Sequence, residues 1–186
     1  MSLRFRRTEI PGVIVVEPHV YRDTRGFFLE AYHAEKYREG GIDVAFVQDN
    51  HSFSTRGTLR GLHAQYPRAQ AKLVRAIDGE IWDVVVDARR GSPCYGRHVA
   101  VTLSASNFLQ LYVPPGLLHG FMVTSDVAQV EYKCSAPYHP EDEFAVAWND
   151  PELAIPWPIA APVLSPRDAA APPLARVQER LLDYAG

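Results

Sequence analysis

Eight short runs of apolar and β-branched residues follow one another within residues 44–132. Each has the length and composition of a β-strand, and the gaps between them are too short for crossover helices. The runs are residues 44–48, 58–63, 71–77, 80–87, 98–103, 109–113, 120–123 and 127–132. Asp78 and Gly79, between two of the runs, are typical of a two-residue hairpin turn. We therefore predict an all-β, antiparallel fold, closed into a barrel or jelly roll that hides its strand edges.

Smaller elements precede this series. Residues 13–16 and 27–32 are rich in β-branched or aromatic residues and predict two strands, with a turn at 23–26 between them. Residues 33–38 are typical of a short helix, which Gly40 would end.

The composition changes after Cys134. Nine of the 15 prolines lie in the segment 135–173, so we predict that it wraps over the barrel without regular strands or helices. Apolar residues then recur at helical spacing, at Leu174, Val177, Leu181 and Leu182. They predict a C-terminal amphipathic helix over 174–185. We expect a single domain whose barrel core spans about 44–134.

The overall composition excludes several classes of function. The 186 residues carry a net charge of −3 with a pI near 6.1, which argues against a nucleic-acid-binding surface. No apolar run approaches the ~20 residues that span a membrane, and the N-terminus lacks the apolar stretch of a signal peptide. Cys94 and Cys134 stand alone, as in a reduced, cytoplasmic protein.

The stretch 48–75 concentrates polar chemistry among short apolar runs. It contains two histidines, four arginines, one lysine and four side-chain amides, namely His51, His63, Arg56, Arg60, Arg68, Arg75, Lys72, Gln48, Asn50, Gln65 and Gln70. Such side chains, directed from strands into one space, would suit an anionic ligand and a proton transfer. The alternative is a polar loop whose charges are solvated.

A second polar focus is His119, which follows the turn Pro114-Pro115-Gly116. Together with His63 it resembles half of a cupin metal site. Metal-binding cupins usually carry a His-x-His pair and a glutamate, whereas here Ala64 and Gln65 follow His63. Two imidazoles alone are a poor site for zinc or iron, so we expect no metal.

Two other residues are ambiguous when taken singly. Tyr132 ends a predicted strand and could be a packed ring, or a general acid whose pKa neighbouring charges could lower. Asp168 could equally be a helix cap.

Several motifs together resemble the dTDP-4-dehydrorhamnose 3,5-epimerase family of cupin-type jelly-roll enzymes. The resemblance covers residues 9–174 and keeps the family's order. Its motifs are RGFF at 25–28, QDNHS at 48–52, LRGLH at 59–63, KLVR at 72–75, PPGLLHGF at 114–121, YKC at 132–134, WNDP at 148–151, WP at 157–158 and LSPRD at 164–168.

The resemblance implies a cofactor-independent and metal-independent isomerase acting on dTDP-4-keto-6-deoxyglucose. Its C4 carbonyl acidifies the C3 and C5 protons, so both centres can be inverted through an enolate. His63 matches the base, Asp168 the carboxylate that orients it, and Tyr132 the proton donor on the opposite face. Lys72 matches a group that stabilises the enolate.

The resemblance also implies a substrate-binding set. It consists of Arg25, Glu30, Gln48, Asp49, Asn50, Arg60, His119, Tyr138, Glu143 and Arg167. Arg60 and His119 match diphosphate or sugar contacts, and Tyr138 stands where a ring stacks on thymine. In the family the segment 25–30 reaches across a dimer, so a homodimer with shared active sites is implied.

Alternatives remain open at this point. Three departures from the family pattern, at Ala64, at Leu117-Leu118 and at Ala145, could reshape the sugar pocket. A mono-epimerase at C3 or C5 would use the same residues. Less favoured are a 3,4-ketoisomerase, a non-catalytic cupin that binds nucleotide sugars, and a metal-dependent cupin dioxygenase.

Overall fold

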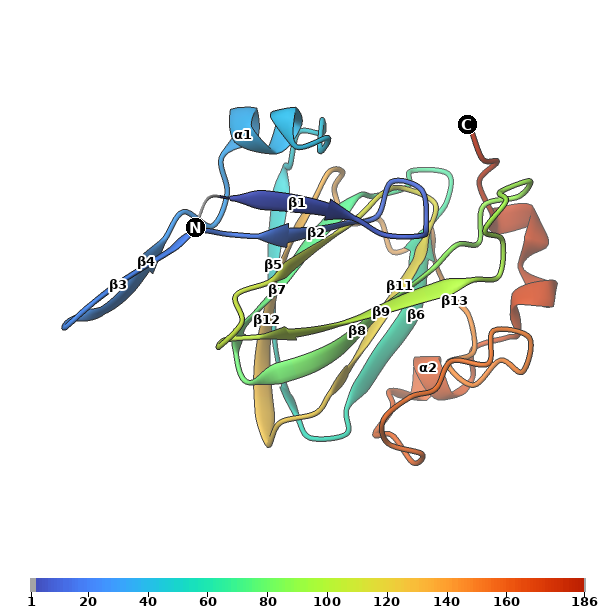
Figure 1. The fold of residues 1–186 in the computed structure, drawn as a ribbon. Coiled ribbons are helices and arrows are strands. Elements are labelled where there is room, and N and C mark those ends of the chain that lie inside the picture. Colours follow the sequence, from blue (N-terminus) through green and yellow to red (C-terminus); the bar gives the residue numbers. More distant parts are fainter. Residues whose placement is uncertain (1–2, 186) are drawn as a thin grey trace.

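The computed structural model describes residues 3–185 and contains two large sheets and a separate hairpin (Figure 1). The first sheet has the strand order β1-β2-β10-β7-β12-β5. Its strands are β1 (Arg4–Arg7), β2 (Ile14–Glu17), β5 (Gln48–Thr55), β7 (Lys72–Asp78), β10 (Gln110–Val113) and β12 (Val127–Cys134). The second sheet has the order β13-β6-β11-β8-β9. Its strands are β6 (Leu59–Gln65), β8 (Glu80–Val86), β9 (His98–Ser104), β11 (Leu118–Val123) and β13 (Glu143–Ala145).

The pairings between these strands are antiparallel, which confirms the predicted all-β architecture. The helical elements are short and lie outside the sheets (Figure 1). They are α1 (Ala34–Glu39), α2 (Pro166–Ala169) and two 3-10 turns, η1 (Leu174–Arg176) and η2 (Gln178–Arg180). Helix α1 confirms the helix predicted at 33–38, and Gly40 follows it as predicted. None of the helices in the described chain is long and apolar enough to span a membrane.

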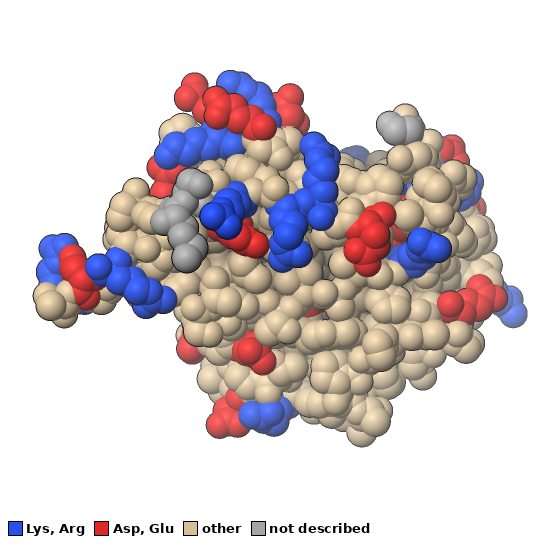
Figure 2. Space-filling view, viewed as in Figure 1, with Lys and Arg blue, Asp and Glu red and all other residues tan. Residues whose placement is uncertain are grey.

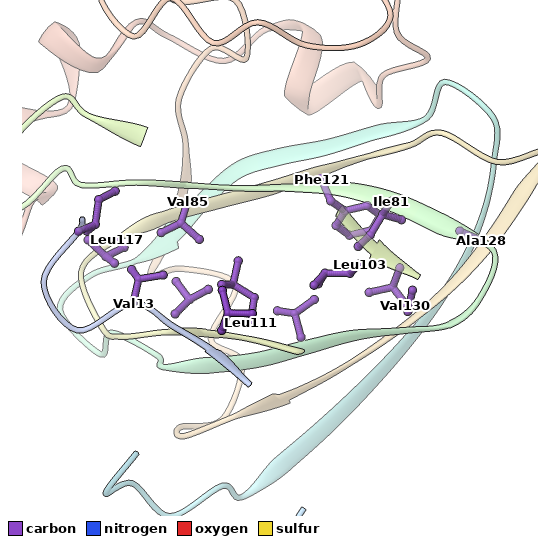
Figure 3. Close-up of a cluster of buried hydrophobic side chains, with 14 of the residues drawn as sticks. Val13, Ile81, Val85, Leu103, Leu111, Leu117, Phe121, Ala128 and Val130 are labelled. Atoms are coloured by element: carbon purple, nitrogen blue, oxygen red, sulfur yellow. The ribbon is translucent and has the colours of Figure 1, made fainter. Parts of the chain in front are cut away.

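The core lies between the two sheets (Figure 3). Val15 and Leu111 enter it from the six-stranded sheet, and Ile81, Val85 and Phe121 enter it from the five-stranded sheet. Each is at most 4% exposed. Because successive side chains on a strand point to opposite faces, only alternate residues can serve this core.

The intervening residues are buried as well, because other segments cover both outer faces. Ile14 packs with Tyr37 of α1 on the outside of the six-stranded sheet. Val84 packs with Leu174 and Leu181 of the C-terminal segment on the outside of the five-stranded sheet. Burial on both faces explains why these strands are continuous apolar runs, and each such side chain contributes roughly 1.5–3 kcal/mol of stability.

The third β element is a hairpin of β3 (Val20–Asp23) and β4 (Gly26–Leu29), which projects away from the two sheets (Figure 1). Its turn confirms the predicted turn at 23–26. The strand predicted at 27–32 ends earlier, at Leu29, and β3 was not predicted because Tyr21 and Arg22 are exposed and show no apolar alternation.

The predicted strand at 44–48 is wrong. The strand, β5, begins at Gln48 and continues to Thr55, whereas Val44 and Phe46 pack as loop residues beside α1. The prediction failed because polar residues dominate β5, so the strand lacks the apolar pattern by which the others were found.

The segment 135–173 does contain regular structure, contrary to prediction. Strand β13 pairs with β6, and helix α2 begins at a proline that occupies a first-turn position. Proline is tolerated there because the first turn of a helix needs no backbone donor.

The predicted C-terminal helix over 174–185 is also wrong. Leu174, Val177 and Leu181 are buried as their spacing suggested, but the chain forms η1 and η2 and then becomes extended. The amide of Arg90 donates to the carbonyl of Leu182, and the carbonyl of Arg90 accepts from the amide of Tyr184. These bonds satisfy the backbone without a helix.

Charges are interspersed on the face of the molecule seen in Figure 2. Basic side chains over β1 and α1 lie beside acidic ones, and large areas of this face carry no charge.

Strands β6 and β11 approach each other closely at two glycines. Gly61 has a φ of +135°, and a Cβ atom there would lie 2.5 Å from Cα of Gly120. Glycine is required, because any side chain would force the two backbones apart. The contact lies beside the directly opposed pair His63 and His119.

We expect Gly61→Ala to destabilise the protein by roughly 2–5 kcal/mol, from backbone strain and overpacking together. Gly91→Ala is the matched control, since Gly91 also has a positive φ but a Cβ there meets nothing within 4 Å. It should cost roughly 1–2 kcal/mol. Urea unfolding of both variants measures the difference, and equal losses would show that the β6–β11 contact carries no special constraint.

Candidate active site

A cavity of about 600 Å³ opens between the two sheets and the segment that covers them. Both sheets contribute, together with α2 and the residues that precede β13. Eleven of the 14 predicted site residues line it, namely Gln48, Asn50, Arg60, His63, Lys72, His119, Tyr132, Tyr138, Glu143, Arg167 and Asp168. The structure therefore brings together side chains that lie up to 120 positions apart in the chain.

His63 and Asp168 form a hydrogen-bonded pair at one wall of the cavity. His63 projects from β6, and its Nε2 lies 2.6 Å from Oδ1 of Asp168. Asp168 lies on α2, whose start is capped by the hydroxyl of Ser165, which accepts from the Asp168 amide at 3.0 Å. The cap fixes the short helical turn and thereby directs the carboxylate toward the imidazole.

The environment of Asp168 keeps its carboxylate ionised. Burial opposes the charge, but the hydrogen bond and the charge of His63, with further donation from Ser165, hold the pKa of Asp168 below its ordinary value. An ionised carboxylate only accepts hydrogen bonds, so Nε2 of His63 is the donor. In the neutral ring Nδ1 is then left as the basic nitrogen.

Tyr132 and Lys72 face this pair from the other sheet. Tyr132 lies on β12 and Lys72 on β7, and the Lys72 ammonium is 5.9 Å from the centre of the Tyr132 ring. Burial, with smaller effects from Cys134 and Glu143, raises the pKa of Tyr132. The charge of Arg60 does lower this pKa, as the sequence suggested a neighbouring charge could, but burial outweighs it and the phenol keeps its proton. Burial lowers the pKa of Lys72.

A second histidine–carboxylate pair lies behind the first. Nε2 of His119, on β11, is 2.9 Å and 3.0 Å from the two carboxylate oxygens of Asp83, on β8. Asp83 is fully buried and was not predicted as a site residue. Its signal in the sequence is that it is the single charge among the apolar residues 81–86 of β8. A carboxylate buried in such a strand needs a partner, which points to a paired group nearby.

Strand β5 directs alternate side chains into the cavity. Gln48, Asn50 and Ser52 line it, and Ser52 was missed because serine by itself carries no signal. Asp49 was predicted to bind substrate, but it lies on the opposite face of the strand. There its carboxylate accepts from Nζ of Lys133 at 3.0 Å. The period of two along a strand separates it from its neighbours.

Arg25 and Glu30 are absent from this cavity. Arg25 lies at the tip of the β3–β4 hairpin and is paired with Asp23 at 2.6 Å. Glu30 follows the hairpin and accepts from Nζ of Lys36 at 2.7 Å. These two predicted residues are therefore not part of the site that their own protomer forms.

The mouth of the cavity is formed by Tyr138, Glu143 and Arg167. The Tyr138 hydroxyl donates to Oε2 of Glu143 at 2.8 Å, and Arg167 pairs with the same oxygen. The Tyr138 ring is 46% exposed, so one face is open to a ligand. Nearby, Arg60 donates to the hydroxyl of Ser54 at 3.0 Å.

Within residues 3–185 there is no group of three or more histidine, cysteine, aspartate or glutamate side chains that could hold a metal ion. The cavity instead offers two imidazole–carboxylate pairs, one half-buried ammonium and one protonated phenol. This set can remove and return protons on an organic ligand, and it can hold an anion.

Comparison with known proteins identifies the family. The model of the family described as dTDP-4-dehydrorhamnose 3,5-epimerase matches residues 7–176. A dTDP-4-dehydrorhamnose 3,5-epimerase from Pseudomonas aeruginosa is 51% identical over 168 residues, which cover 89% of this chain and 93% of that protein. The chain belongs to the dTDP-4-dehydrorhamnose 3,5-epimerase family. The predicted resemblance is thereby confirmed, and the family is one of isomerases.

Two further members give the extent of the match. A dTDP-4-dehydrorhamnose 3,5-epimerase from Neisseria gonorrhoeae is 46% identical over 178 residues, which cover 95% of this chain but only 54% of that protein. The chain thus spans about half the length of this relative. The crystal structure of dTDP-6-deoxy-D-glucose-3,5-epimerase from Legionella pneumophila, in complex with dTDP-4-keto-L-rhamnose, has a TM-score of 0.96 and 46% identity, with 100% of both chains covered. This agreement confirms the cupin-type jelly roll.

The lowered pKa of Asp168 predicts a pH dependence of stability. Its carboxylate stabilises the fold above the unfolded-state pKa of about 3.9, and this contribution is lost as the pH falls through the lower folded-state pKa. The stability difference between wild type and Asp168→Asn should therefore shrink below about pH 4. Urea unfolding at a series of pH values measures it.

Asp183→Asn is the control, because Asp183 is 78% exposed and pairs only with Arg90 at the surface. Its difference from wild type should stay small at every pH. A difference for Asp168→Asn that did not shrink below about pH 4 would contradict the assignment of an ionised carboxylate.

Proposed function

We propose that this chain is a cofactor-independent epimerase that inverts C3 and C5 of dTDP-4-keto-6-deoxyglucose, yielding dTDP-4-keto-L-rhamnose. One observation carries the proposal. His63 and Tyr132 stand on facing sheets and line one cavity, and His63 is hydrogen-bonded to the Asp168 carboxylate. Inversion of a carbon centre needs a base on one face and an acid on the other, and two opposed sheets supply that arrangement.

His63 is the base in this proposal. Nδ1 of its neutral ring takes the proton from C3 or C5, and the electron pair of that C–H bond moves into the enolate, with charge on the C4 oxygen. Asp168 stabilises the imidazolium that forms, through the 2.6 Å hydrogen bond. The ammonium of Lys72 lies in the same cavity and offsets the enolate charge.

Tyr132 returns a proton from the opposite face. Its raised pKa keeps the phenol protonated until the enolate forms. The enolate electron pair then takes the phenolic proton, and the carbonyl is restored. His63 afterwards releases its proton to water and Tyr132 takes one from water, so the reaction is balanced without an oxidant or reductant.

The rest of the cavity is assigned to the nucleotide. Arg60 and His119 present charge-assisted donors to the diphosphate or the sugar. Gln48, Asn50 and the exposed Tyr138 are assigned to the thymidine, because they line the same cavity. Glu143 and Arg167 are assigned to the substrate at the cavity mouth.

We also propose a homodimer with shared active sites. The β3–β4 hairpin carries exposed aromatic rings, with Tyr21 59%, Phe27 58% and Phe28 68% exposed. A cluster of this kind is typical of a protein interface. A second protomer would bury these rings and would receive Arg25 and Glu30, which do not reach the cavity of their own chain. The buried, unbridged Cys94 and Cys134 favour a reducing, cytoplasmic location.

Solvent deuterium incorporation into dTDP-4-keto-6-deoxyglucose, followed by NMR, tests the reaction. We expect label at both C3 and C5, and His63→Ala should lower its rate by roughly 10²–10⁴-fold because the general base is lost. His51→Ala is the control, since His51 pairs with Gln129 outside the cavity. Label at one carbon alone would indicate a mono-epimerase, and tight binding without exchange would indicate a binding protein.

Mixing two inactive variants tests the shared sites. In a heterodimer of His63→Ala and Arg25→Ala, one of the two sites is complete. The Arg25→Ala protomer supplies its His63, and the His63→Ala protomer supplies the hairpin with Arg25. Randomly mixed protomers should therefore recover roughly one quarter of wild-type activity. Mixing each variant with itself is the control, and a mixture no more active than its components would contradict the exchange of hairpins.

A further inference from the structure

One short segment carries two residues of the cavity mouth. It runs from residue 137 to residue 143, bears Tyr138 and Glu143, and ends in the acidic turn Glu141-Asp142-Glu143. Three arginines from three different parts of the chain hold this turn. Arg167 of α2 pairs with Glu143, and the other two, Arg68 and Arg180, do not line the cavity.

Arg180, near the end of the chain, holds the backbone of the acidic turn. Its Nη2 donates to the carbonyl of Asp142 at 2.8 Å and to that of Glu141 at 3.3 Å. Its Nη1 lies 3.5 Å from the carbonyl of Glu143. The guanidinium also stacks over the ring of Phe144, 5.1 Å from its centre. Arg180 thus engages four consecutive residues at once.

Arg68 holds the side chains of the same turn. Its guanidinium pairs with both carboxylate oxygens of Asp142 and with Oε1 of Glu141 at 2.6 Å. The carboxylate of Asp142 is buried, so it depends on this partner. Nearby, Gln65 accepts from the amide of His139 at 3.0 Å and so holds the residue that follows Tyr138.

We propose that Arg180 is a positioning residue for nucleotide binding, so that the C-terminal segment is a structural component of the substrate site. This inference rests on the function proposed above. Arg180 lies four positions beyond residue 176, where the match to the family model ends.

The backbone of the acidic turn controls the position of a cavity residue, Tyr138. Glu143 begins β13, and its carboxylate accepts from the Tyr138 hydroxyl. Fixing the Glu143 backbone therefore fixes the orientation of the Tyr138 ring, which is the stacking surface proposed for thymine. Within residues 3–185 the hydrogen bonds of Arg180 end on the carbonyls of the acidic turn, and none of them reaches His63 on β6 or Tyr132 on β12. Loss of Arg180 should consequently weaken nucleotide binding and leave proton transfer intact.

We expect Arg180→Ala to raise both the KM for the dTDP-sugar and the Kd for dTDP by about tenfold. Its kcat should stay within about twofold of wild type, because the reacting groups are untouched. Arg180→Lys should recover only part of the loss, since one ammonium cannot span three carbonyls as a planar guanidinium does. Steady-state kinetics and calorimetric titration with dTDP give these values.

Two controls separate positioning from general stability. Arg176→Ala removes an exposed arginine of the same segment and should leave KM and Kd unchanged. Leu181→Ala removes a side chain that is 1% exposed and should destabilise the fold while leaving Arg180 in place. The expected result is a lowered Tm with near-normal KM.

The inference would be overturned by an Arg180→Ala variant with unchanged KM and Kd, or by one that loses kcat instead. It would also be overturned if Leu181→Ala raised KM as much as Arg180→Ala. Failure of the proposed function looks different, because wild-type protein would then not exchange substrate protons, whether or not it bound dTDP.

Discussion

The hydrogen bond between His63 and Asp168 joins the barrel to the segment that covers it. The imidazole stands on a strand of the five-stranded sheet, and the carboxylate comes from a four-residue helix 105 positions later. Burial of a carboxylate is costly unless a partner compensates it. The covering segment can therefore bury Asp168 only while it is docked in register with β6. The Ser165 cap and the apolar contacts of Leu174 and Leu181 maintain that register.

Burial has different consequences for Tyr132, for Lys72 and for the pair of His119 and Asp83. The reason is that a phenol is neutral when protonated, an ammonium is charged when protonated, and the pair holds its groups in mutual contact. Burial raises the pKa of Tyr132, so that the phenol stays protonated, and it lowers the pKa of Lys72. It also isolates the pair of His119 and Asp83 from solvent. Desolvation favours the neutral form of a lone group, whereas a matched pair retains its interaction. One cavity between two sheets can thus contain a proton donor, a proton acceptor and a cation together.

The sequence predicted those elements whose side chains alternate between two apolar environments. The predicted bounds of strands β2, β7, β8 and β12 agree with the observed ones to within one or two residues. Of the 14 site residues that the motifs predicted, 11 line the cavity. Prediction failed where polar residues replaced the apolar pattern, as in β5. It also failed where spacing alone suggested a helix, because Leu174, Val177 and Leu181 can be buried equally well by 3-10 turns.

The sequence by itself determined the all-β class, the family and the types of chemical group, since these depend on residue identity and on local patterns. Only the tertiary structure decided which groups meet. It turned Asp49 away from the cavity, brought Asp83 to His119, and directed Arg180 onto the turn beside Glu143. Strand alternation, sheet pairing and the path of the covering segment set these contacts. They depend on distances between residues far apart in the chain, which no local pattern encodes.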